Sequence, residues 1–106
     1  MEKRRGCGVL FYDPIGQRIL CFLRDNKPGI PFPNHVDLIG GHVEEGETPE
    51  EAARREIAEE MLDLRTGKPF VLDGHALFDV YIDERDTEHH IFYKEADFDI
   101  ADVKFL

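Results

Sequence analysis

Three glutamates, Glu56, Glu59 and Glu60, are the residues whose types and spacing indicate chemistry in this chain. Residues three and four positions apart are neighbours on a helix, so these carboxylates should lie together on one flank. Neighbouring carboxylates repel one another and raise one another's pKa, which does not stabilise a helix. A divalent cation relieves the repulsion, and oxygen ligands suit Mg²⁺. The spacing therefore predicts a metal site, with a merely solvated acidic helix face as the alternative.

The helix that must carry these glutamates has a well-marked predicted start at Thr48, whose hydroxyl can accept from an unpaired N–H of the first turn. Glu51 completes a capping box, and Pro49 suits the first helical position. The pattern predicts a helix from about Pro49 to about Leu62. The apolar stripe that should face a core comprises Ala53, Ile57, Met61 and Leu64.

A glycine-rich turn leads into this helix, and residues 41–63 together read GHVEEGETPEEAARREIAEEMLD. This segment resembles the signature motif of the Nudix hydrolases, a family that cleaves nucleoside diphosphates linked to another moiety. The matching positions are Gly41, Glu47, Arg55, Glu56, Ile57, Glu59 and Glu60. Chance does not readily give agreement at so many fixed spacings.

The resemblance implies a role for each carboxylate of the motif. Glu56, Glu59 and Glu60 should ligate a divalent metal, Mg²⁺ with Mn²⁺ as the alternative, and the main-chain carbonyl of Gly40 should add a ligand. One of these glutamates, or a glutamate from a distant loop, should serve as general base. The sequence does not decide between those two.

The resemblance also implies a bracing pair, Glu47 with Arg55, which should hold the loop against the helix next to the structural Gly41. Arg suits this role because its rigid fork can bind a carboxylate through two hydrogen bonds. The chain departs from the family pattern after the helix, where one inserted residue places Asp63 at the helix-terminating position usually held by Gly. It departs again at Ile39, which stands at a frequent proline.

Length and composition predict one domain, residues 1–106, with 13 basic and 23 acidic side chains and a formal charge of −10. That charge disfavours binding of duplex nucleic acid. Cys7 and Cys21 lie in apolar, strand-like runs and are interpreted as small core residues in a reducing compartment, with a disulfide between neighbouring strands as the alternative. The sequence shows neither a secretory segment nor an apolar run that could cross a membrane, which favours a soluble cytoplasmic protein.

The remaining pattern predicts strands, a loop, the helix and more strands, an α+β arrangement. The predicted strands are 6–12, 18–24, 75–82 and 89–94, with a turn at 13–17 and a loop at 26–34. In the third strand Ala76, Phe78, Val80 and Ile82 should share one side. The resemblance implies a Nudix-type α/β/α sandwich with a mixed sheet, here without the usual C-terminal strand and helix. An open face ending in Phe105 and Leu106 then predicts a homodimer.

Candidate substrate contacts lie outside the motif. Arg24 is the first candidate for holding phosphates and Phe32 for contacting a base, although Phe32 could equally lie in the core. The wider set of candidates is His35, His42, Lys27, Arg85, Lys94, Phe78, Phe92, Tyr81 and Tyr93, with Glu84, Glu88 and Glu95 as extra carboxylates. His89 and His90, adjacent on a strand, should point to opposite faces.

These expectations together describe a metal-dependent pyrophosphohydrolase that breaks a phosphoric anhydride bond in a small nucleotide. A catalytically inactive nucleotide-binding or sensor module of the same fold is the main alternative. An isoprenoid diphosphate isomerase would need a catalytic cysteine in the cleft, and both cysteines are predicted to lie in strands away from the motif.

Overall fold

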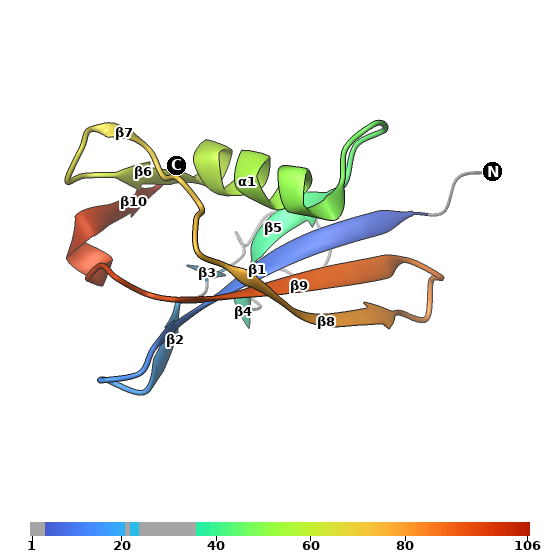
Figure 1. Cartoon of the computed structure of the whole chain (residues 1–106), viewed down its shortest axis with the longest axis horizontal. Helices are drawn as coiled ribbons and strands as arrows, with labels where there is room; N and C mark the ends of the chain where they lie inside the picture. The colour runs from blue at the N-terminus through green and yellow to red at the C-terminus, as the bar shows by residue number, and fades with distance from the viewer. Residues whose placement is uncertain (1–3, 21, 24–35) are drawn as a thin grey trace.

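A mixed sheet of five strands forms the centre of the protein, which we describe from a computed structural model at residues 4–20, 22–23 and 36–106 (Figure 1). Its strands are β1 (Arg5–Asp13), β2 (Arg18–Leu20), β5 (Ile39–His42), β8 (Ala76–Ile82) and β9 (Glu88–Glu95). The order is β2-β1-β9-β8, and β5 also pairs with β1. Strands β1 and β9 are parallel and the other pairs antiparallel. The predicted α+β class with a mixed sheet is confirmed.

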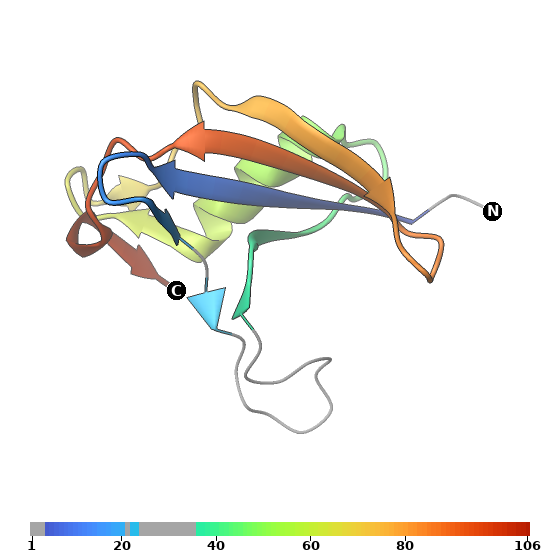
Figure 2. The ribbon, with the colours of Figure 1, turned by 90° about the horizontal axis from the view of Figure 1, so that it is seen from below.

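Helix α1 (Pro49–Glu60) is the α-helix of the described residues, and it packs against β5 and β1 on one face of the sheet. Figure 2 shows the other face, with the strands in front of the helix. Three short strands, β6 (Met61–Asp63), β7 (Lys68–Pro69) and β10 (Val103–Phe105), form a second sheet. Strands β3 (Phe22–Leu23) and β4 (Val36–Asp37) pair with each other, and a 3-10 helix, η1, spans Ile100–Asp102.

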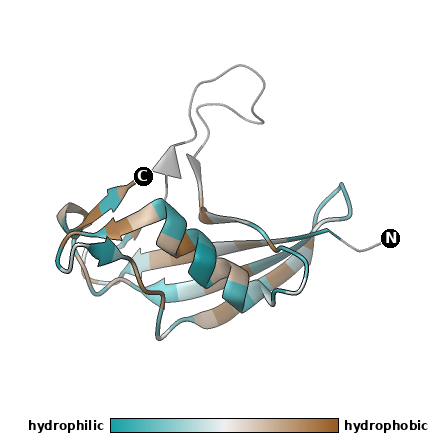
Figure 3. Cartoon of the chain, turned by 90° about the horizontal axis from the view of Figure 1, so that it is seen from above, coloured by the Kyte–Doolittle hydropathy of each residue, from teal (hydrophilic) through white to brown (hydrophobic). Residues whose placement is uncertain are grey.

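The hydrophobic core lies between α1 and the large sheet. Alternation along β1 turns Val9 and Phe11 toward the helix, and both are fully buried with Ile57 of α1. Figure 3 shows the helix with hydrophilic residues over much of its outward side. Phe11 also packs edge-to-face with Phe70 and Phe98, with ring centroids 5.8 and 5.5 Å away. This core fixes α1, which carries most of the motif, relative to β1 and β5.

The predicted end of the helix is wrong. Helix α1 stops at Glu60, and Met61 already has extended backbone, with φ −127° and ψ 128°. Met61 is fully buried as predicted, but as the first residue of β6. Asp63 does not terminate the helix; it lies in β6, where its carboxylate accepts from the guanidinium of Arg65. Leu64 is 51% exposed and does not belong to the apolar stripe.

The predicted face of the third strand, now β8, is also wrong. A bulge between Leu77 and Asp79 inserts a residue into the strand. Leu77, Val80 and Ile82 therefore lie on one side of β8. The side chains of β8 are exposed on both sides. Phe105 lies in β10, which pairs with β6 in the second sheet, and the Leu106 N–H donates to the main-chain carbonyl of Glu60.

Among the described residues, no helix is long and apolar enough to cross a membrane.

Candidate active site

The start of helix α1 is fixed by local hydrogen bonds, as the sequence predicts. The Glu51 N–H donates to Thr48 Oγ1 at 3.1 Å, and the Thr48 N–H donates to Glu51 Oε1 at 3.0 Å. Pro49 occupies the first turn, where a missing N–H costs no helical hydrogen bond. This capping box fixes the start of the helix, and the burial of Ala52, Ala53 and Ile57 turns its glutamate flank away from the core.

Two glycines of β5 bring the main chain close to its neighbours. A Cβ built on Gly40 would lie 2.0 Å from the carbonyl oxygen of Cys7, so only glycine fits against β1 there. A Cβ on Gly41 would lie 2.6 Å from the carboxyl carbon of Glu56. Gly41 therefore leaves the space that the Glu56 carboxylate occupies, between the helix and the sheet.

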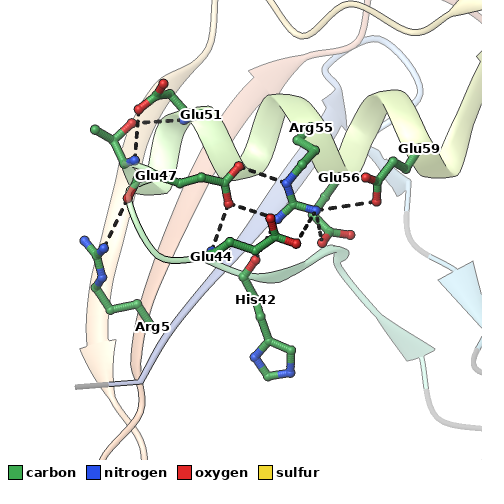
Figure 4. Close-up of polar contacts among 9 residues, drawn as sticks. Arg5, His42, Glu44, Glu47, Glu51, Arg55, Glu56 and Glu59 are labelled. Carbon is green, nitrogen blue, oxygen red and sulfur yellow. Dashed lines mark hydrogen bonds and ion pairs between the residues drawn. The ribbon is translucent and has the colours of Figure 1, made fainter. Parts of the chain in front are cut away.

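Arg55 is the centre of the polar network at this site (Figure 4). Its Nε donates to Glu47 Oε2 at 2.8 Å and its Nη2 donates to Glu47 Oε1 at 3.0 Å, a bidentate ion pair. Nη2 also donates to the main-chain carbonyl of His42 at 3.0 Å. The hydrogen bonds from Arg55 hold the pKa of the Glu47 carboxyl below its usual value. One guanidinium thus joins the glycine-rich loop to the helix.

The same guanidinium contacts two of the predicted metal ligands. Arg55 Nη1 lies 3.0 Å from Glu56 Oε1 and 3.5 Å from Glu59 Oε2, with Glu44 Oε1 at 3.8 Å. The side chain of Glu56 is 14% exposed, whereas that of Glu59 is 58% exposed. Four carboxylates, counting Glu47, therefore surround one cation. This cluster at the flank of the helix has a net negative charge.

The pKa of Glu60 shows the effect of these neighbouring negative charges. Burial first, and then the charges of Glu56 and Glu59, raise the pKa of the Glu60 carboxyl. The direction agrees with the mutual repulsion expected from their spacing. A bound cation would stabilise the ionised form of this half-buried carboxylate, which its two neighbours destabilise.

The donor set fits a hard divalent cation in its chemistry, because all three side chains offer carboxylate oxygens from one flank of α1. In the described part of the chain, however, no three His, Cys, Asp or Glu side chains are gathered closely enough to hold an ion. Arg55 holds Glu56 and Glu59 in the present arrangement. Arg55 contacts one oxygen of each carboxylate, Glu56 Oε1 and Glu59 Oε2, so the second oxygen of each could bind a metal while these contacts stay in place.

Cys7 lies beside the motif, contrary to the expectation that both cysteines are distant from it. Strand pairing sets Cys7 opposite Gly41, and the charge of Glu56 acts on its thiol. Burial is the largest influence and raises the pKa of Cys7, so the thiol is a poor nucleophile or acid. The prediction that Cys7 is a core residue is confirmed, since it is 7% exposed.

Several other candidates lie away from the network. The imidazole of His42 is exposed and points away from the carboxylates in Figure 4, whereas its main-chain carbonyl accepts a hydrogen bond from Arg55 Nη2. His89 and His90 face opposite sides of β9, as predicted, and contact Asp83 and Glu88 at 2.8 and 2.7 Å. Arg24, Lys27, Phe32, His35 and Cys21 lie outside the described residues.

Comparison with known proteins identifies the family. The family model described as NUDIX domain matches residues 2–102. The chain belongs to the Nudix family. It is 40% identical over 81 residues to a nucleoside triphosphatase NudI of Salmonella paratyphi B, a match that covers 74% of this chain and 56% of that protein. The chain therefore spans little more than half the length of this Nudix relative.

Solved structures confirm the Nudix fold. A structure from a study of MutT from Aliivibrio salmonicida and Vibrio cholerae has a TM-score of 0.65 at 15% identity, covering 100% of this chain and 79% of that one. The structure of DR0079 from Deinococcus radiodurans has a TM-score of 0.69 at 22% identity, covering 97% of this chain and 66% of that one. Members of this family generally use divalent cations, which agrees with the chemistry of the glutamate flank.

Proposed function

We propose that this chain is a divalent-metal-dependent pyrophosphohydrolase that cleaves a nucleoside diphosphate linked to another moiety. The observation that carries the proposal is the position of Glu56, Glu59 and Glu60 on one flank of α1, where the charges of the first two act on Glu60. This flank lies beside a loop that Arg55 ties to the helix. The NudI relatives are nucleoside triphosphatases by name, which supports a nucleoside triphosphate as the first substrate to test.

The chain's own residues hold and orient the reacting groups. Glu56, Glu59 and Glu60, with the carbonyl of Gly40, would hold Mg²⁺ or Mn²⁺, which supplies charge neutralisation for the diphosphate and makes water more acidic. One of the glutamate carboxylates accepts the proton of the water that attacks phosphorus, and the leaving phosphate departs in line. Arg55 Nη1 donates to Glu56 Oε1 at 3.0 Å and holds this carboxylate beside Gly41.

The test replaces single carboxylates by their isosteric amides. Glu59→Gln and Glu60→Gln should each remove most Mg²⁺-dependent release of mononucleotide while leaving the thermal unfolding transition cooperative. Glu45→Gln, an exposed glutamate of the same loop, is the matched control for loss of one negative charge. Full activity in both the Glu59 and Glu60 variants would refute the assignment of ligands.

A nucleotide-binding or sensor module without catalysis makes a different prediction. Such a module would be stabilised by metal and nucleotide without turning the nucleotide over. Mg²⁺ as the metal, a homodimer as the assembly, the cytoplasm as the location and the exclusion of duplex nucleic acid stay predictions from the sequence.

A further inference from the structure

Arg5, at the start of β1, contacts the glycine-rich loop from 42 residues away in the sequence. Its guanidinium Nη2 donates to the main-chain carbonyl of Glu47 at 3.1 Å. Figure 4 shows the side chain reaching from the sheet to the residue that precedes the N-cap of α1. We propose that Arg5 is a positioning residue, which holds this loop so that Glu47 and Arg55 keep Glu56 in place; the proposal rests on the function proposed above.

Arg5 holds the loop at both ends. Its main-chain carbonyl accepts from the Val43 N–H at 3.0 Å, where the loop leaves β5. Its side chain binds Glu47 O, just before the helix begins. Between these points the chain closes on itself, because the Glu47 N–H donates to Glu44 O at 3.1 Å. A single residue therefore bridges the two ends of the loop, and the strand it belongs to is paired on both sides, with β5 and β9.

The contact leads directly to the reacting groups through Glu47. The main chain of Glu47 is held by Arg5, while its side chain makes the bidentate pair with Arg55. Its Oε1 also accepts from the Glu44 N–H at 2.9 Å. Arg55 then binds Glu56 at 3.0 Å. Displacement of the Glu47 main chain would move both of its carboxylate contacts, and active-site geometry tolerates errors of only a fraction of an ångström.

Arg4 provides a matched control for this role. It is the neighbouring arginine, it is exposed, and its main-chain carbonyl accepts from the Glu88 N–H of β9. Arg4→Ala removes the same charge from the same end of β1 and leaves the hydrogen bond from Arg5 to Glu47 in place. Any effect of Arg5→Ala beyond that of Arg4→Ala is therefore due to the loop contact and not to net charge.

The first experiment measures the loop without any substrate or metal. In Arg5→Ala, amide hydrogen exchange at Glu44 and Glu47 should accelerate about tenfold, the scale of one lost hydrogen bond from a charged donor. Exchange at these amides in Arg4→Ala should match the wild type. Unchanged exchange in Arg5→Ala would overturn the proposal whatever the protein's activity.

The second experiment asks whether the contact acts through Glu47. In Arg5→Ala, kcat should fall about tenfold with KM nearly constant, since Arg5 is proposed to act through the loop and not on the substrate. In a Glu47→Ala background, where the pair with Arg55 is already lost, the same change should have little further effect on kcat. An equal loss in both backgrounds, in proportion to a fall in Tm, would mean that Arg5 only stabilises the fold. If the wild type turns over no nucleotide while exchange still rises in Arg5→Ala, the loop contact stands and the proposed hydrolase activity falls.

Discussion

Replacing Gly41 by Ala should separate catalysis from stability at this site. A Cβ on Gly41 would lie 2.6 Å from the carboxyl carbon and Oε1 of Glu56 and 2.8 Å from Oε2. The closest contact is about 0.8 Å short of the 3.4 Å at which ordinary van der Waals contact begins. The Glu56 carboxylate must therefore move by nearly an ångström. Misplacement of about 1 Å costs on the order of 10²-fold in rate, so we expect kcat to fall by that factor.

Stability should change little in the same variant. The clash involves the end of a flexible side chain, and Gly41 lies in β5 with a backbone conformation open to residues other than glycine. We expect a loss below about 1 kcal/mol in the free energy of unfolding. Gly40→Ala is the contrasting variant, because its Cβ would lie 2.0 Å from Cys7 O and 2.7 Å from Gly8 Cα. Main-chain atoms cannot rotate away, so that variant should lose much of its stability.

The assay compares kcat, KM and Tm for the wild type and both glycine variants at saturating Mg²⁺ and substrate. We expect slow turnover at nearly unchanged Tm for Gly41→Ala, and a clearly lower Tm for Gly40→Ala. Turnover of Gly41→Ala at the wild-type rate would refute the reasoning that this glycine makes room for Glu56. So would a fall in Tm as large as that of Gly40→Ala.

Three further predictions concern the core and the titrating groups. Ile57→Ala should lower the free energy of unfolding by about 2–5 kcal/mol, because Ile57 of α1 is fully buried in the core; urea denaturation should show a lower midpoint with the same m-value. The pKa of Glu60 is higher in the folded chain than in the unfolded chain. Its contribution to stability is therefore fully present below the pKa of the unfolded chain, and it is lost as the pH rises through the pKa of the folded chain. In metal-free buffer Glu60→Gln should therefore melt above the wild type at about pH 8 and level with it near pH 4. The hydrogen bond from His89 lowers the pKa of Asp83 to about 2, so its contribution is present above the unfolded value of 3.8 and lost as pH falls toward 2; Asp83→Asn should flatten the Tm profile over that interval.

The start of the helix could be predicted from sequence because its determinants are local. Thr48, Pro49 and Glu51 lie within four residues of one another, and their hydrogen bonds form within the first turn. The end could not, because apolar spacing continues to Met61 in the same way whether the chain stays helical or becomes extended. The pairing of β6 with β10, some forty residues further along the chain, is tertiary and leaves no local signal.

Contacts across the sheet explain what the sequence did not show about the site. The register of β1 against β5 places Cys7 opposite Gly41, and no spacing rule connects residues so far apart. The same is true of Arg5 and Glu47, whose contact depends on where β1 begins relative to the loop. The placement of the α1 carboxylates on one flank could be predicted because helical geometry makes residues three and four positions apart neighbours. The spacing of the motif residues is therefore local in sequence, whereas the contacts that hold them in place come from distant parts of the chain.

The most direct test of the central claim is the release of mononucleotide from nucleoside triphosphates by the purified chain, with Mg²⁺ and with excess chelator, beside Glu60→Gln. We expect turnover that needs the metal and is almost abolished in the variant, while cooperative thermal unfolding shows that both proteins are folded. Equal turnover in the wild type and Glu60→Gln, or turnover that persists in chelator, would contradict it.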